Sequence, residues 1–249
     1  MCRFVAYLGP VVTLEELLVA PPHSLVHQSW APERQVSGVV NADGFGVGWY
    51  DRRRRPEPAV HRATKPVWAD RSFASFSGVV ASHAVLAVAR GATAPAPVEE
   101  SGTQPFSSGP WLFAHNGSVD GFREGVASRL RRRLSPERES AILGASDSEV
   151  LFALALHAMD SGASPEGAVA SVVATVAEES GGRVNLALTD GDRVAATRAG
   201  DSLFALSDEQ RTIVASEPFD EDPHWCEVPE GSLVTGTAGH VGIRPMEAA

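Results

Sequence analysis

Apolar and polar residues repeat with two different periods along this chain, and the changes of period predict the order of its elements. Short apolar runs of strand character come first, among them VAYLG at 5–9 and AVLAVA at 84–89, which ends at Arg90. Apolar residues then recur every three to four positions over 146–160 and 164–181, which predicts two helices. Residues 183–199 and 202–217 return to short runs interrupted by polar turns, which predicts two hairpins.

Residues at the helix boundaries support this assignment. Ser146 is placed to cap the first long helix, with Glu149 at the reciprocal position of a capping box. Gly181 follows the last apolar residue of the second helix, where a left-handed residue commonly ends a helix. Thr13 and Glu16 fit a further capping box, which predicts a brief helix within residues 12–20.

The order of these elements predicts the fold class. Strands come first, two helices follow, and antiparallel strands come last, which favours an α+β fold over a doubly wound parallel sheet. No repeat or low-complexity linker divides the chain, so we expect a single domain over residues 1–249. The Pro-rich stretch ATAPAPVEESGTQP is expected to be a long loop inside that domain.

Composition and charge narrow the function classes. The chain has 249 residues and a net charge of −10, which argues against a nucleic-acid groove. The N-terminus has no basic segment followed by a long apolar run, so no signal peptide is expected, and no stretch is long enough to cross a bilayer. We therefore expect a cytoplasmic protein without a membrane partner, in which Cys2 and Cys226 stay reduced.

Three glycines in the stretch NADGFGVGWY occupy alternate positions. Gly44, Gly46 and Gly48 would share one face of an extended segment. A strand face without side chains predicts that a neighbouring layer or a ligand approaches the backbone closely.

No metal or cofactor is expected. The histidines are scattered singly, and CxxC, HExxH and a phosphate-binding loop are all missing from the sequence. The remaining chemistry begins with Cys2, which directly follows Met1. Removal of Met1 would give Cys2 a thiol and a free α-amine, hence a nucleophile and a base in one residue.

Further polar candidates lie where apolar strands end. Arg90 and Thr93 follow one strand, and a guanidinium is suited to bind a carboxylate. Asn116 and Gly117 are expected just past another, where an amide and a backbone N–H could stabilise an oxyanion. Asp147 falls in the first turn of a helix. Each also has a structural interpretation: an arginine with a turn threonine, an Asn-Gly turn, and a carboxylate favoured by the helix dipole.

Five motifs together resemble those of a known family. In chain order they are MCRF, NADGFGVGWY, ARGAT, FAHNGSV and SDSEV, and they are similar to the motifs of class II glutamine amidotransferase domains, which are N-terminal-nucleophile hydrolases. The resemblance implies a four-layer αββα sandwich, with Cys2 as the nucleophile and its own α-amine as the base. It also implies that Asn116 and Gly117 stabilise the tetrahedral oxyanion.

The same resemblance implies a substrate class. Arg90 and Thr93 would bind the α-carboxylate of a γ-glutamyl group and Asp147 its α-ammonium, so that a small γ-glutamyl amide is cleaved through a thioester and glutamate is released. Two positions depart from the family pattern. Val88 and Gln104 stand where many members have histidine, and neither is assigned a role.

Three functions remain open at this point. The chain could be a hydrolase of one specific γ-glutamyl amide, a hydrolase of glutathione-like γ-glutamyl peptides or a stand-alone glutaminase subunit, or a non-catalytic module that binds γ-glutamyl compounds. The sequence does not indicate the oligomeric state or the leaving amine.

Overall fold

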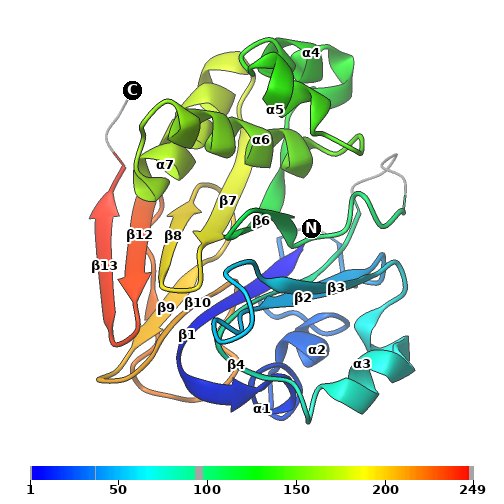
Figure 1. Ribbon diagram of the computed structural model, residues 1–249, viewed down its shortest axis with the longest axis vertical. Coiled ribbons are helices and arrows are strands. Elements are labelled where there is room, and N and C mark those ends of the chain that lie inside the picture. Colours follow the sequence, from blue (N-terminus) through cyan, green and yellow to red (C-terminus); the bar gives the residue numbers. More distant parts are fainter. Residues whose placement is uncertain (1, 37, 93–97, 247–249) are drawn as a thin grey trace.

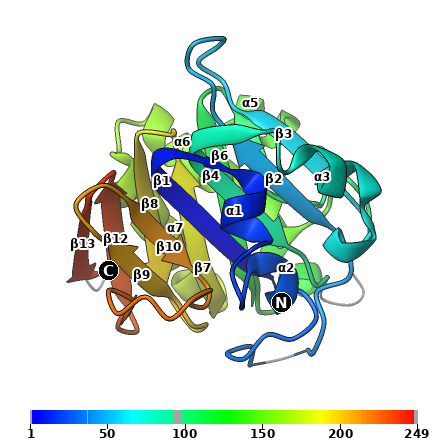
Figure 2. The ribbon, with the colours of Figure 1, turned by 90° about the horizontal axis from the view of Figure 1, so that it is seen from below.

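Two antiparallel sheets lie face to face at the centre of the protein (Figures 1 and 2). The computed structural model describes residues 2–36, 38–92 and 98–246. Within these ranges one sheet has seven strands, in the order β11 (Cys226–Glu227), β9 (Phe204–Ser207), β10 (Thr212–Ala215), β1 (Arg3–Thr13), β4 (Ala81–Ala89), β2 (Phe45–Trp49) and β3 (Ala59–Ala63). The other has six, in the order β13 (His240–Pro245), β12 (Ser232–Thr237), β8 (Arg193–Arg198), β7 (Gly182–Thr189), β6 (Trp111–Val119) and β5 (Phe106–Ser108).

Helices cover the outer face of each sheet. The seven-stranded sheet carries α1 (Leu14–Leu18), α2 (Leu25–Gln28), the 3-10 turn η1 (Val67–Ala69) and α3 (Arg71–Phe76). The helical layer on the six-stranded side contains η2 (Phe122–Glu124), α4 (Val126–Arg131), α5 (Pro136–Ser140), α6 (Asp147–Asp160) and α7 (Pro165–Glu179). The layers run αββα, so the predicted α+β class and four-layer sandwich are confirmed. No helix in the described ranges combines the length and apolar character that a membrane span requires.

Three apolar clusters fill the three interfaces between the layers. Side chains of β1 alternate between two of them: Phe4 and Leu8 point between the sheets, whereas Val5 and Tyr7 point toward the helices α1 and α2. Cys2 belongs to the cluster between the sheets. The start of β1 therefore lies inside the sandwich.

The helix caps follow the sequence in most details. Thr13 and Glu16 form the predicted capping box at α1. Ser146 caps α6 by accepting the N–H of Glu149 at 3.2 Å. The reciprocal half of that second box is wrong, because the Glu149 carboxylate accepts the N–H groups of Leu143 and Gly144 instead.

Strand β6 corrects one expectation. Asn116 and Gly117 do not follow the strand but lie within it, paired with Asn185 and Val184 of β7. Gly117 has φ of +151°, and a Cβ there would lie 1.8 Å from the carbonyl oxygen of Arg183. Only glycine lets the strand pass this point, so the Asn-Gly pair is built into the ladder rather than into a turn.

The predicted bare glycine face is confirmed for Gly46 and Gly48 of β2, whereas Gly44 lies just before the strand with φ of +127°. A Cβ on Gly46 would lie 2.3 Å from the carbonyl oxygen of Gln104, and one on Gly48 would lie 2.6 Å from Cδ1 of Leu112. The close neighbours are therefore β6 of the opposite sheet and the segment that leads into β5. These glycines set how closely the two sheets approach each other.

We predict that Gly46→Ala lowers the free energy of unfolding by about 1–3 kcal/mol, because the Gln104 backbone cannot move aside as a side chain would. Urea denaturation measures the effect. Gly167→Ala is the matched control: Gly167 lies inside α7, a Cβ there would lie 3.4 Å from Oγ of Ser164, and alanine should leave stability unchanged or raise it. Equal stability of Gly46→Ala and the parent would contradict the account of this face.

Candidate active site

A cavity of about 220 Å³ lies at the end of the sandwich where β1 begins and β4 ends. Its wall contains Cys2 just before β1, Arg90 after β4, Gly117 from β6 and Asp147 at the start of α6. Four of the predicted site residues, far apart in the sequence, thus share one cavity. Thr93 lies outside the described residues.

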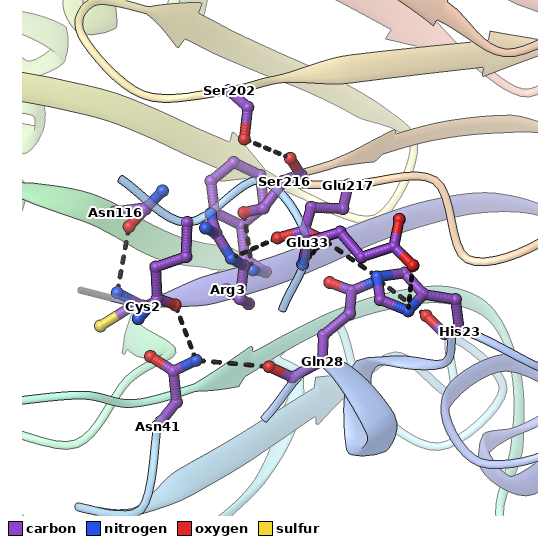
Figure 3. A network of polar contacts seen from close by, with 12 residues as sticks. Cys2, Arg3, His23, Gln28, Glu33, Asn41, Asn116, Ser202, Ser216 and Glu217 are labelled. Carbon is purple, nitrogen blue, oxygen red and sulfur yellow. Dashed lines mark hydrogen bonds and ion pairs between the residues drawn. The ribbon is translucent and has the colours of Figure 1, made fainter. Parts of the chain in front are cut away.

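Asn116 lies behind the cavity wall and contacts Cys2 directly. The backbone N–H of Cys2 donates to Oδ1 of Asn116 at 3.0 Å (Figure 3). Asn116 is fully buried, and its Nδ2 has no hydrogen-bond partner among the residues described. A buried amide donor without a partner costs free energy, so it is suited to bind a group that arrives with the substrate.

The Cys2 side chain is only 8% exposed. Burial raises the pKa of its thiol, and the positive charge of Arg90 and a backbone hydrogen bond from Gly91 oppose that shift. The thiol is therefore in its neutral form near pH 7 and requires a base to become a nucleophile.

Arg90 is held in place by the loop before β2. Its Nη1 donates to the carbonyl oxygen of Asp43 at 3.1 Å, and its own carbonyl accepts the Asp43 N–H at 3.0 Å. The Asp43 carboxylate accepts the N–H of Ala92 at 2.8 Å. The NADG motif thus fixes the backbone on both sides of Arg90, a role that its glycine spacing did not reveal.

Asp147 is fixed by two backbone donors. Its Oδ1 accepts the N–H of Ser148 at 2.7 Å and its Oδ2 accepts the N–H of Val119 at 3.0 Å. Each carboxylate oxygen keeps lone pairs for a further donor. The carboxylate is therefore oriented at the cavity wall and suited to bind a cation there.

A buried hydrogen-bond network that the sequence does not predict lies behind this wall. Gln104 donates from Nε2 to the carbonyl oxygen of His115 at 3.0 Å and accepts the His115 N–H at 2.5 Å. His115 Nδ1 lies 2.9 Å from Oγ of Ser148. The network connects the residue before Asn116 to the residue after Asp147. Its one sequence signal was Gln104 itself, which departs from the family pattern.

The other departure has no polar role. Val88 is buried in the apolar cluster between the sheets.

Cys226 is a free, exposed cysteine on β11, in the seven-stranded sheet. In the described part of the chain, no cluster of three or more His, Cys, Asp or Glu side chains could hold a metal ion.

We predict that Gln104→Met lowers the rate of glutamate release from a γ-glutamyl amide by about tenfold to a hundredfold, because the buried His115 backbone loses both partners and Asn116 shifts with it. Steady-state kinetics measure the effect. Gln210→Met, in the exposed turn before β10, is the control and should leave the rate unchanged. Wild-type kinetics in Gln104→Met would show that the network does not support the site.

This chain is similar in sequence to a known family and to two full-length hydrolases. The family model "Glutamine amidotransferases class-II" matches residues 19–207. A γ-glutamyl-hercynylcysteine sulfoxide hydrolase from Mycolicibacterium smegmatis is 38% identical over 99% of this chain and 100% of its own length. The protein of the same name from Mycobacterium tuberculosis (strain CDC 1551 / Oshkosh) is 36% identical over 100% of this chain and 98% of its own.

Solved structures agree with the sequence matches. A glutamine aminotransferase class-II domain protein from Silicibacter pomeroyi superimposes with a TM-score of 0.72 at 28% identity, covering 99% of this chain and all of that one. An allosteric regulatory enzyme of purine biosynthesis shares the fold, with a TM-score of 0.68 at 16% identity over 100% of this chain and 50% of its own. By its sequence, its four layers and its full-length relatives, this chain belongs to the class II glutamine amidotransferase family.

Proposed function

We propose that the protein hydrolyses a γ-glutamyl amide through a γ-glutamyl thioester on Cys2, with γ-glutamyl-hercynylcysteine sulfoxide as its substrate and glutamate as one product. The observation that carries the proposal is the contact of Asn116 with Cys2: Oδ1 holds the Cys2 nitrogen at 3.0 Å while the buried Nδ2 has no described partner. The substrate follows the two full-length relatives that carry this name.

The first step forms the thioester. Removal of Met1 turns the Cys2 nitrogen into an α-amine, whose ordinary pKa is about 7.7–8.0, so the neutral form is available to take the thiol proton. The sulfur attacks the γ-carbonyl carbon, and Nδ2 of Asn116 with the N–H of Gly117 stabilises the oxyanion. The ammonium then donates its proton to the leaving amine as the carbon–nitrogen bond breaks.

The second step releases glutamate. The α-amine, neutral again, takes a proton from water as the water oxygen attacks the thioester carbonyl. The same oxyanion donors act on this second tetrahedral intermediate. The sulfur leaves and recovers its proton, which restores the thiol.

The γ-glutamyl head group is bound by opposite charges. The Arg90 guanidinium binds the α-carboxylate and the Asp147 carboxylate binds the α-ammonium, with Thr93 as a further donor. The Asp43 loop and the two backbone donors to Asp147 support this assignment because they fix both groups before substrate arrives.

The proposal also covers the domain organisation, partners and location of the enzyme. Residues 1–249 act as one glutaminase-like domain on a small molecule, without nucleic acid or membrane. The reaction takes place in the reducing cytoplasm, where Cys2 remains a free thiol.

We predict that the purified protein releases glutamate from γ-glutamyl-hercynylcysteine sulfoxide faster than from glutathione or glutamine, as measured by a coupled glutamate assay. Cys2→Ala should release none from any of the three, since it lacks the attacking sulfur, whereas Cys226→Ala should match the parent. Release from glutamine alone would overturn the substrate assignment. No release from any substrate by the parent would leave only a binding module.

Asp147→Asn should raise KM for the γ-glutamyl substrate by about tenfold to a hundredfold and change kcat less, because a charge-assisted hydrogen bond to the α-ammonium is weakened. Asp120→Asn, at an exposed position after β6, is the charge-matched control and should leave KM unchanged. An unchanged KM in Asp147→Asn would show that the head group is bound elsewhere.

A further inference from the structure

A fully buried arginine directly follows the nucleophile. Arg3 is 0% exposed, and its Nε lies 2.9 Å from Oε1 of Glu217, which is itself 1% exposed (Figure 3). Burying two charges costs several kcal/mol per ion before their attraction is counted, and an apolar pair of similar size would often be at least as stable. This ion pair therefore calls for a reason beyond packing.

Glu217 joins Arg3 to the layer around α2. Its Oε2 lies 2.9 Å from Nε2 of His23 and accepts the backbone N–H of Glu33 at 2.8 Å. The neighbouring Ser216 accepts the N–H of Phe4 at 3.0 Å. The start of β1 is thus fixed to the end of β10 and to the segments on both sides of α2.

Beyond its ion pair with Glu217, the Arg3 guanidinium lies in surroundings with few hydrogen-bond partners. Within the described ranges, Nη1 and Nη2 of Arg3 are buried without a hydrogen-bond partner. The nearby Asp201, 2% exposed, also has no hydrogen bond to either side-chain oxygen, and burial raises its pKa while Arg183 and Arg3 oppose that shift. A charge held in such surroundings acts more strongly on its neighbours than one in water.

Cys2 directly precedes Arg3 in the chain, so its nitrogen and the buried guanidinium belong to adjacent, buried residues. Burial lowers the pKa of Arg3, and attraction to Glu217, Asp201 and Cys2 opposes that shift. The charged side chains that act on the Cys2 thiol are Arg90, just after β4, and Asp147 of α6. The further titratable groups around the pair are His23 beside Glu217, and Arg183 and His115, which act on Asp201.

We propose that Arg3, held by Glu217, is a positioning residue whose fixed positive charge keeps the α-amine of Cys2 in its neutral, proton-accepting form. This inference rests on the proposed function, in which that amine is the base. A cation beside an amine disfavours the ammonium, because the two like charges repel in a medium of low polarity. Glu217 sets both the place and the net strength of that charge.

The direction in which the kcat/KM profile moves distinguishes this role from a purely structural one. Loss of the Arg3 charge raises the pKa of the α-amine, so the acid limb of the kcat/KM profile moves to higher pH. Loss of the Glu217 charge leaves Arg3 uncompensated and moves the same limb to lower pH. A purely structural pair would lower kcat/KM in both variants without moving the limb in opposite directions.

The test is the pH profile of kcat/KM for Arg3→Met, Arg3→Lys and Glu217→Gln. We expect shifts of about one pH unit, upward for Arg3→Met and downward for Glu217→Gln, with Arg3→Lys close to the parent because it keeps the charge. Arg211→Met, which removes an arginine paired with Asp208 at the β9–β10 turn, is the control and should leave the profile unmoved.

A second readout needs no substrate. Iodoacetamide alkylates Cys2 at a rate that depends on the ionisation of its thiol. Measured against pH in a Cys226→Ser background, this rate reports the electrostatics around Cys2 even where turnover is weak. We expect its midpoint to move in the same two directions. Profiles of Arg3→Met and Glu217→Gln that coincide with the parent, or move together, would overturn the inference. Turnover that survives in Cys2→Ala would instead overturn the proposed function.

Discussion

The hydrogen bond from the Cys2 nitrogen to Oδ1 of Asn116 connects the two sheets at the point where the chemistry is proposed to occur. Cys2 directly precedes β1 of the seven-stranded sheet, and Asn116 lies in β6 of the six-stranded sheet. The bond holds its 3.0 Å length only if the separation of the sheets is fixed. The glycine face of β2 and the apolar cluster between the sheets fix that separation, so the fold and the proposed reaction depend on the same packing.

Two networks of buried polar groups surround this bond, although apolar side chains would pack there at a lower cost in free energy. Gln104 and His115 support Asn116 from one side, while Arg3 and Glu217 hold the start of β1 from the other. Each network is fixed by backbone hydrogen bonds, so its members keep their orientation without substrate. Preorganisation of this kind lets donors act on a developing charge without moving at the moment of reaction.

The sequence predicted the parts of the structure that depend on local side-chain chemistry or on the spacing of apolar residues along the chain. The capping box of Thr13 and Glu16, the Ser146 cap and the glycine face all follow from short-range rules, and the structure agrees with them. The prediction that Asn116 and Gly117 lie just past the strand was wrong. It followed from the fact that an Asn-Gly pair is typical of turns. Only the partner strand β7 shows that the ladder continues through it.

The supporting residues could not be predicted for a related reason. Arg3 and Glu217 are separated by most of the chain, and neither occurs in a pattern that marks a buried ion pair. In the sequence Gln104 stands out only as a departure from the family pattern, and its contacts with His115 depend on how β5 and β6 pair. The five motifs sufficed for the family because their order along the chain is specific, whereas the groups that orient them are known only from the packed fold.

In the proposed reaction Cys2, freed of Met1, carries the glutamyl group during turnover. Acid quenching of the enzyme in the steady state with γ-glutamyl substrate, followed by mass spectrometry of its peptides, tests this most directly. We expect the N-terminal peptide to begin at Cys2 and to carry one glutamyl group, lost on treatment with hydroxylamine as a thioester would be. A glutamyl group on another residue, or turnover by protein that retains Met1, would contradict it.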